Sequence, residues 1–181
     1  MDGCLRLFAA LRLPAEWAAA LVGWQLAALG EVPGARLVSP ASLHLTFAFL
    51  GERPAAEVAM IAAEVREAAA RARLPVRLTP LRYRETGSVG MLELADEGGR
   101  ATALAADVQE RLAGLGIATG EGRPWLPHIT VLRFRVRPRL NPAPPAIGPC
   151  VPSDAALYHS RLRSGGAQYD VIDSFALGGT N

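Results

Sequence analysis

Apolar residues along this chain recur with two different periods, and the change of period outlines a set of helices and strands. Residues 15–29, 54–73 and 100–115 repeat apolar side chains every three or four positions, which predicts amphipathic helices. Strand-like runs rich in Leu, Val, Phe and Tyr lie at residues 4–13, 42–51, 75–84, 89–95, 127–136, 155–163 and 169–177. The order is strand, helix, strand, helix, strands, helix, strands, which indicates a mixed α+β fold.

Two segments between these elements read as turns or loops. Residues 138–152 contain six prolines and predict a loop without regular structure. The sequence SGGAQ at residues 164–168 separates the last two strands and predicts a hairpin.

The pattern His-x-Thr occurs twice, each time within a strand-like run. The two segments are HLTFAFLG at residues 44–51 and HITVLRFR at residues 128–135. The chain has only three histidines, so two such pairings are a rare coincidence. The motifs lie 84 residues apart, close to half of the 181 residues, as an internal duplication with two pseudo-symmetric lobes would give.

Strand geometry places the polar residues of each motif together. Residues i and i+2 of a strand point to the same face, so His44 and Thr46 share one face and His128 and Thr130 share another. Their apolar neighbours point the opposite way, into a core. If the two lobes face each other, the four polar side chains converge on one cleft.

Paired imidazoles suit displacement at phosphorus, which needs a base behind the nucleophile and an acid behind the leaving oxygen. Histidine fills either role near pH 7 because its ordinary pKa is about 6.5. A threonine hydroxyl can bind a phosphoryl oxygen, and Arg133 adds positive charge after the second motif. Phe49 occupies the same position in the first motif. Simple alternation puts Arg133 on the face opposite His128, so a bulge or a strand end must turn it inward.

Charge and composition say less about function than the motifs do. All 19 basic residues are arginine, and a net charge of +2 is too small to argue for nucleic acid by itself. Arg135, Arg137 and Arg139 alternate beyond the second motif, and we interpret them as a solvated edge, with a groove for an RNA backbone as the alternative. Cys4 and Cys150 fit a reducing cytoplasm, although the sequence leaves a single disulfide open.

Other candidate residues have ordinary explanations. Trp125 either stacks on a nucleobase or packs against the protein ahead of Pro127. His159 has no threonine partner and is expected on a strand surface. The uncharged run at residues 17–30 is too short to span a bilayer, and it lacks the cleavage site of a signal peptide. We therefore expect a cytoplasmic protein without a membrane segment.

The sequence resembles the two-histidine phosphoesterase superfamily, and within it the bacterial and archaeal RNA 2′,3′-cyclic phosphodiesterases, also called 2′-5′ RNA ligases. The resemblance rests on the two His-x-Thr motifs with the arginine after the second, and it extends over essentially the whole chain. Further matching segments are RLFAALRLP, LHLTFAFLGE, WLPHITVLR and LYHSRLRSGGAQYDVIDSFAL.

This resemblance implies that residues 1–181 form a single bilobal α+β domain. Each lobe would be an antiparallel sheet backed by helices, with the active-site cleft between the lobes. By similarity, His44 would donate a proton to the leaving 3′ oxygen and His128 would activate water. Thr46, Thr130 and Arg133 would hold the phosphate.

The resemblance also implies a substrate and a product. The substrate would be RNA with a 2′,3′-cyclic phosphate or a 2′-5′ linkage, and hydrolysis would give a 2′-phosphate. With an RNA hydroxyl in place of water, the same displacement would join two RNA ends. The mechanism would need no metal and no cofactor, and nothing in the sequence demands more than a monomer.

The paired histidines have two other possible roles, in a metal site or in a non-catalytic binding module. A metal site lacks ligands, because no carboxylate flanks either motif and the cysteines lie elsewhere. A non-catalytic module that binds a nucleotide or RNA in the same cleft is the stronger rival. Binding alone has little need for two groups that titrate near neutrality, so we expect an enzyme.

Overall fold

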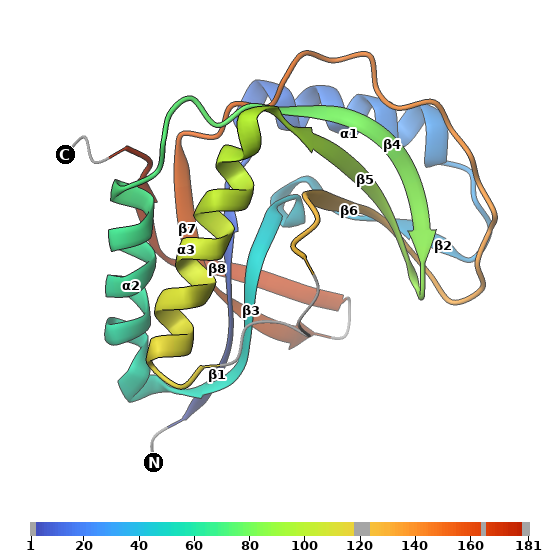
Figure 1. Ribbon diagram of the computed structural model, residues 1–181. Coiled ribbons are helices and arrows are strands. Elements are labelled where there is room, and N and C mark those ends of the chain that lie inside the picture. Colours follow the sequence, from blue (N-terminus) through green and yellow to red (C-terminus); the bar gives the residue numbers. More distant parts are fainter. Residues whose placement is uncertain (1–2, 118–123, 164–165, 179–181) are drawn as a thin grey trace.

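The computed structural model describes residues 3–117, 124–163 and 166–178, which form two antiparallel sheets and the helices around them (Figure 1). The strands are β1 Cys4–Leu11, β2 Ala35–Leu37, β3 Leu45–Pro54, β4 Leu78–Thr86, β5 Val89–Asp96, β6 His128–Phe134, β7 Asp154–Arg163 and β8 Gly166–Ala176. The α-helices are α1 Ala15–Leu29, α2 Val58–Ala70 and α3 Arg100–Gly114, and the short 3-10 helices are η1 Pro40–Ser42, η2 Ala55–Glu57 and η3 Glu97–Gly99.

Each sheet has four strands and forms one lobe. The strand orders are β3-β1-β7-β8 in the first sheet and β2-β6-β5-β4 in the second, and all neighbouring strands are antiparallel. Helices α2 and α3 lie side by side against the first sheet, while α1 runs along the outer face of the second (Figure 1). The expected α+β fold with helix-backed antiparallel sheets is confirmed.

The lobes do not coincide with the two halves of the chain, which corrects a simple duplication of contiguous halves. Strands from both chain ends, β1, β7 and β8, join β3 in the first sheet, and the chain between them builds most of the second. The three-residue strand β2 was not predicted, because so short a segment carries no alternation. The predicted hairpin between the last two strands is present, but its turn at Ser164 and Gly165 lies outside the described residues.

The two faces of the first sheet have different environments. Leu7, Ala9 and Leu11 of β1 point toward the helices and belong to the main core. Phe8 and Ala10 point the other way, into a small second cluster with Ala156 and Tyr158 of β7. This alternation leaves an aromatic surface on the sheet face that looks toward the other lobe.

The proline-rich segment is held along the outside of the second sheet, as a loop. The indole N–H groups of Trp17 and Trp24 donate to the carbonyl oxygens of Gly148 and Ala143. The same two tryptophans therefore pack against the core, as expected, and also fasten this loop.

A buried carboxylate fixes the start of that loop. Glu85 accepts hydrogen bonds from the Arg137 guanidinium and from the backbone N–H groups of Arg139 and Leu140. Arg139 adopts a left-handed φ of 62°, which its bond to Glu85 helps to hold. Arg137 thus has a structural ion pair, contrary to a role in guiding RNA.

The structure describes both cysteines and the apolar run near the N-terminus. Cys4 is exposed and Cys150 is buried, and both are free thiols. Within the described ranges, no helix is long and apolar enough to cross a membrane. The apolar run at residues 17–30 forms most of α1, where Trp17, Leu21 and Leu29 pack into the core.

A β-bulge follows the threonine of each His-x-Thr motif. In β6, Thr130 pairs with Met91 and Leu132 pairs with Gly90, so Val131 is an extra residue. In β3, Thr46 pairs with Ala10 and Ala48 pairs with Ala9, so Phe47 is extra in the same way. A bulge shifts the alternation by one residue, so side chains beyond it change face.

Each bulge is stabilised by a glutamine from a helix. The side-chain amide of Gln25 in α1 donates to the Val131 carbonyl at 2.8 Å, and that of Gln109 in α3 donates to the Phe47 carbonyl at 2.8 Å. The two glutamines are 84 residues apart, like the two histidines. An extra residue disturbs the ladder of hydrogen bonds, and these amides add buried donors there. The Val131 carbonyl also accepts from the Val38 N–H at 3.0 Å, so Gln25 supplements a backbone bond.

Replacing Gln25 by methionine should destabilise the protein, because Gln25 is only 1% exposed and the Val131 carbonyl loses a buried donor. We expect the free energy of unfolding to fall by about 1–2 kcal/mol, as measured by urea unfolding. The matched control is Gln168→Met, since Gln168 is exposed on β8 and its amide makes only a 3.4 Å contact. Equal stability of the two variants would contradict the bulge's dependence on Gln25.

Candidate active site

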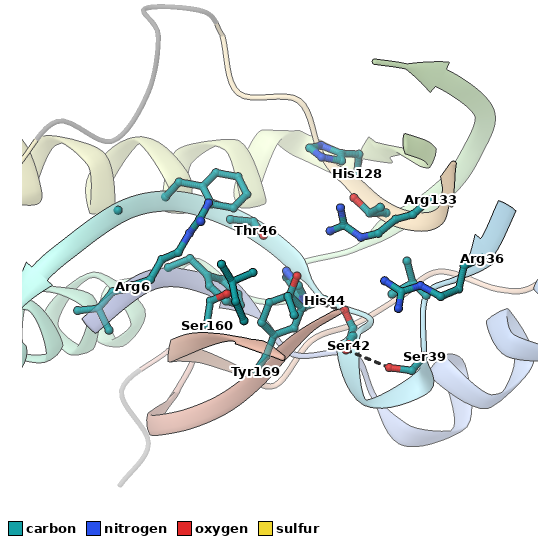
Figure 2. A pocket seen from close by; sticks show the side chains of 18 of the residues that line it. Arg6, Arg36, Ser39, Ser42, His44, Thr46, His128, Arg133, Ser160 and Tyr169 are labelled. Carbon is teal, nitrogen blue, oxygen red and sulfur yellow. Dashed lines mark hydrogen bonds between the residues drawn. The ribbon is translucent and has the colours of Figure 1, made fainter. Parts of the chain in front are cut away.

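A cavity of about 590 Å³ lies between the two lobes and is lined from both sheets (Figure 2). The five residues that the sequence predicts to act on phosphate, His44, Thr46, His128, Thr130 and Arg133, all line this cavity. His44 immediately precedes β3, and His128 is the first residue of β6. The predicted convergence of the two motifs on one cleft is therefore present in the structure.

Both imidazoles are oriented by the same backbone interaction. Nδ1 of His44 lies 2.8 Å from the carbonyl oxygen of Ser42, and Nδ1 of His128 lies 2.8 Å from that of Leu126. A carbonyl can only accept, so Nδ1 carries the hydrogen in each ring. In the neutral form each Nε2 is then an unprotonated acceptor, left for the cavity.

The bulge at Val131 resolves the orientation of Arg133. Val131 and Leu132 are both buried, and after this break in alternation Arg133 is exposed on the face of His128 and Thr130. Figure 2 shows its guanidinium pointing into the cavity. Of the two alternatives that the sequence left open, a bulge or a strand end, the structure has the bulge. The same shift in β3 brings the exposed Phe49 to the cavity.

The cavity is strongly cationic. Arg6 and Arg36 line it together with Arg133, and no Asp or Glu is among its described lining residues. Arg133 makes no ion pair with any residue that the structure describes. Three guanidinium groups beside two imidazoles form a site for an anion, and arginine's planar fork matches phosphate. In the described part of the chain, no three His, Cys, Asp or Glu side chains gather to hold a metal ion.

His44 packs into an aromatic box, whereas no aromatic ring of the described residues contacts His128 in this way. Its ring centroid lies 4.8 Å from that of Phe8, 5.8 Å from Tyr158 and 5.1 Å from Tyr169, whose ring meets it edge-on at 89°. Phe8 and Tyr158 stack on each other with centroids 4.8 Å apart. The box comes from β1, β7 and β8, which hold the ring at the inner face of the first sheet.

This environment keeps His44 neutral at pH 7. The pKa of His44 is lowered to about 4, mainly by burial, with smaller contributions from the positive charges of Arg133 and His128. The hydrogen bond from Nδ1 to the Ser42 carbonyl works in the opposite direction. The dominant cause is desolvation, because an imidazolium against three aromatic rings loses its hydration.

The sequence missed the residues that complete the cavity: Arg6, Phe8, Arg36, Ser39, Ser42, Ser160 and Tyr169. They reach the cavity through strand pairing between distant parts of the chain, which no local pattern reveals. Arg36 is an example, because it reaches the cavity only through the pairing of β2 with β6, where it lies directly opposite Arg133.

Trp125 is not among the residues that line the cavity, so the structure does not support the stacking alternative. Its indole packs against the main core, and its N–H donates to the Thr46 carbonyl oxygen at 2.9 Å. This contact ties the segment before β6 to β3 in the other lobe. The packing alternative is therefore the one that the structure supports. His159 also lies outside the cavity, on the opposite face of β7 from Tyr158 and Ser160.

Two helix-backed antiparallel sheets, with a His-x-Thr strand from each meeting at one cationic cleft, define a phosphoesterase-like fold and site. The 2'-5' RNA ligase superfamily matches residues 13–160 of the chain. The chain belongs to this family.

Known relatives cover nearly the whole length. An RNA 2',3'-cyclic phosphodiesterase from Thermus thermophilus is 36% identical over 189 aligned residues, which cover 97% of this chain and 91% of that protein. The structure of E. coli LigT complexed with NADP+ is 28% identical with a TM-score of 0.80, covering 97% of this chain and 98% of that one. A crystal structure of a Thermus thermophilus protein is 34% identical with a TM-score of 0.74, covering 97% of this chain and 100% of that one.

The ring of His44 should titrate near pH 4 in the free protein, which NMR can follow through its Cε1 proton. Replacing Arg133 with glutamine should raise this pKa, because the guanidinium disfavours the charged imidazole. Saturating inorganic phosphate should raise it as well, because an anion favours the imidazolium. A pKa above 6 in the unliganded protein would contradict this account of the site.

The low pKa of folded His44 makes the stability of the protein depend on pH. An imidazole in the unfolded chain titrates near pH 6.5, so below that pH the unfolded state binds a proton that folded His44 does not. The free energy of unfolding should therefore fall as the pH decreases from about 6.5 to about 4. His44→Gln should lose this part of the decline, whereas His159→Gln should keep it.

Proposed function

We propose that this protein is an RNA 2′,3′-cyclic phosphodiesterase that opens the cyclic phosphate to a 2′-phosphate. The observation that carries the proposal is the pairing of two imidazoles across one cationic cavity, each fixed by its Nδ1 and each with a threonine two residues later. The family and the activity named for the Thermus thermophilus relative support the same substrate.

The cyclic phosphate carries one negative charge, and the cavity offers it matched donors. The hydroxyls of Thr46 and Thr130 and the Arg133 guanidinium bind its non-bridging oxygens. Arg133 stabilises the additional charge that develops on these oxygens as water attacks. The absence of carboxylates among the described lining residues keeps competing negative charge away from the phosphate.

Proton transfers at the two histidines complete the reaction. Water attacks phosphorus while Nε2 of His128 accepts its proton, and the bond from phosphorus to the 3′ oxygen breaks. His44 donates a proton from Nε2 to that oxygen, which becomes the free 3′ hydroxyl. One water is consumed, and the phosphate remains on the 2′ oxygen.

To act as an acid, His44 must be in its charged imidazolium form, which its surroundings in the free protein disfavour. Burial and the nearby cations keep the ring neutral in the free protein. A bound phosphate opposes the charge of Arg133, so we propose that substrate binding protonates His44. The acid would then be charged only when a substrate is present.

An RNA 5′ hydroxyl in the place of the water gives a 2′-5′ linkage by the same displacement. We propose this ligation as a secondary activity of the site. The acting unit would be a monomer, since residues of a single chain supply both histidines and the arginines. We also propose that it acts in the cytoplasm.

The test is a short RNA with a 2′,3′-cyclic phosphate end, incubated with the protein in excess EDTA. The wild type should convert it to the 2′-phosphate, separable from the 3′-phosphate by chromatography. His44→Ala and His128→Ala should each lower kcat by roughly 10²- to 10⁴-fold, because each removes an acid or base. His159→Ala is the matched control, since that histidine lies outside the cavity, and it should retain full turnover.

Two results would overturn the proposal. If both cavity variants turn over as fast as the wild type, the histidines are not the acid and base. If the wild type binds the RNA but leaves the cyclic phosphate intact, the cleft belongs to a binding module.

A further inference from the structure

The cavity extends to both sides of the reacting groups, and its two ends differ in chemistry. Arg36, Ser39 and Ser42 lie on one side of His44, and Arg6 and Ser160 lie on the other (Figure 2). The strand register places aromatic rings toward the Arg6 end: Phe8 lies two residues from Arg6 and opposite Phe49, and Tyr169 lies opposite Ser160. One end is therefore polar and cationic, and the other is largely aromatic.

The polar end concentrates positive charge. Arg36 of β2 is the direct cross-strand partner of Arg133 of β6. Like charges placed opposite each other on paired strands destabilise a sheet. Arg36 and Arg133 therefore place two guanidinium groups next to each other at this end of the cavity.

Hydroxyl donors and a close backbone contact complete the polar end. The Oγ atoms of Ser39 and Ser42 lie 3.0 Å apart at the cavity wall (Figure 2). A Cβ on Gly166 of β8 would lie 2.6 Å from a terminal nitrogen of Arg36, so the hairpin backbone closely confines the guanidinium. Glycine also suits the φ of 116° found at this residue. The Arg36 guanidinium is thus held at a defined place beside the reacting centre.

We propose that Arg36, Ser39 and Ser42 form a second phosphate subsite, which binds the phosphate on the 5′ oxygen of the nucleotide that carries the cyclic phosphate. This inference rests on the proposed function. The reacting phosphate occupies the centre, between the two His-x-Thr motifs, and the aromatic end suits the nucleobase because rings stack on bases. The 5′ phosphate is the one remaining anionic group of that nucleotide, and Arg36 with the hydroxyls of Ser39 and Ser42 is the donor cluster at the remaining end.

The subsite gives the enzyme a way to select chain ends. A free nucleoside 2′,3′-cyclic phosphate has no 5′ phosphate and would leave the subsite unused. A nucleotide at the end of an RNA always has one, as a phosphodiester. Arg36 would then direct the enzyme toward RNA ends and away from the small cyclic nucleotides that RNA degradation releases.

The experiment compares two substrates that differ only at this group: adenosine 2′,3′-cyclic phosphate and 5′-phosphoadenosine 2′,3′-cyclic phosphate. For the wild type, kcat/KM should be about tenfold or more higher with the 5′-phosphorylated substrate, because a charged hydrogen-bonded contact is added. In Arg36→Ser the ratio should fall close to 1. Arg36→Lys should keep an intermediate ratio, since it retains the charge without the fork.

Arg6→Ser is the matched control, because Arg6 is the cation at the opposite end of the same cavity. It should preserve the ratio of the two kcat/KM values. A ratio near 1 in the wild type would overturn the subsite. So would a ratio lost in Arg6→Ser but kept in Arg36→Ser, which would place the 5′ phosphate at the aromatic end.

Binding of the products separates this inference from the proposed function. Adenosine 2′,5′-bisphosphate should bind the wild type more tightly than adenosine 2′-phosphate in calorimetry, and Arg36→Ser should lose that difference. If neither cyclic substrate is turned over but this binding difference is found, the proposed function fails while the subsite stands. If turnover occurs and neither preference is found, the subsite alone fails.

Discussion

The extra strand residue that follows each His-x-Thr motif is the constraint on which the arrangement of the cleft depends. Gln25 holds the Val131 carbonyl, and Gln109 holds the Phe47 carbonyl. Each bond stabilises an extra strand residue, and the extra residue reverses the alternation beyond it. Without that reversal, Arg133 would point away from His128, and the phosphate site would lose its central cation.

The frame is pseudo-symmetric, but the two halves of the site are specialised. The histidines share the same orienting bond to the carbonyl two residues before them. Their surroundings differ, because three aromatic rings enclose His44 and an arginine follows only the second motif. Burial lowers the pKa of His44 to about 4, so this ring depends on a bound anion for its proton. A displacement at phosphorus needs one acid and one base, and unequal surroundings provide that difference from two equal motifs.

Much of this arrangement could be predicted from the sequence. Apolar periodicity located the three long helices within a few residues, and the repeated His-x-Thr motif located the reacting groups. The conflict between strand alternation and Arg133 indicated a bulge or a strand end, and the structure contains a bulge. The spacing of 84 residues could also have identified Gln25 and Gln109, since they repeat the offset of the histidines.

Other features depend on tertiary pairing and leave no local pattern. The aromatic box around His44 combines Phe8, Tyr158 and Tyr169, which only the order β3-β1-β7-β8 brings together. Strand β2 is too short to alternate, so Arg36 could not be placed beside Arg133. The sequence left stacking and packing open for Trp125, and the choice depended on the Thr46 carbonyl in the other lobe, which accepts from its indole N–H. Sequence patterns thus identified the reactive groups, while the residues that set their environment required the fold.

In the proposed reaction, the two imidazoles act on opposite sides of one phosphorus atom. A crystal structure of the protein with a uridine–vanadate complex tests it most directly, because vanadium there adopts the five-coordinate geometry of the displacement. We predict that Nε2 of His44 and Nε2 of His128 contact the two opposite apical oxygens, with Thr46, Thr130 and Arg133 on the equatorial oxygens. Vanadate bound with both histidines on the same side, or bound outside the cavity between the lobes, would contradict the account.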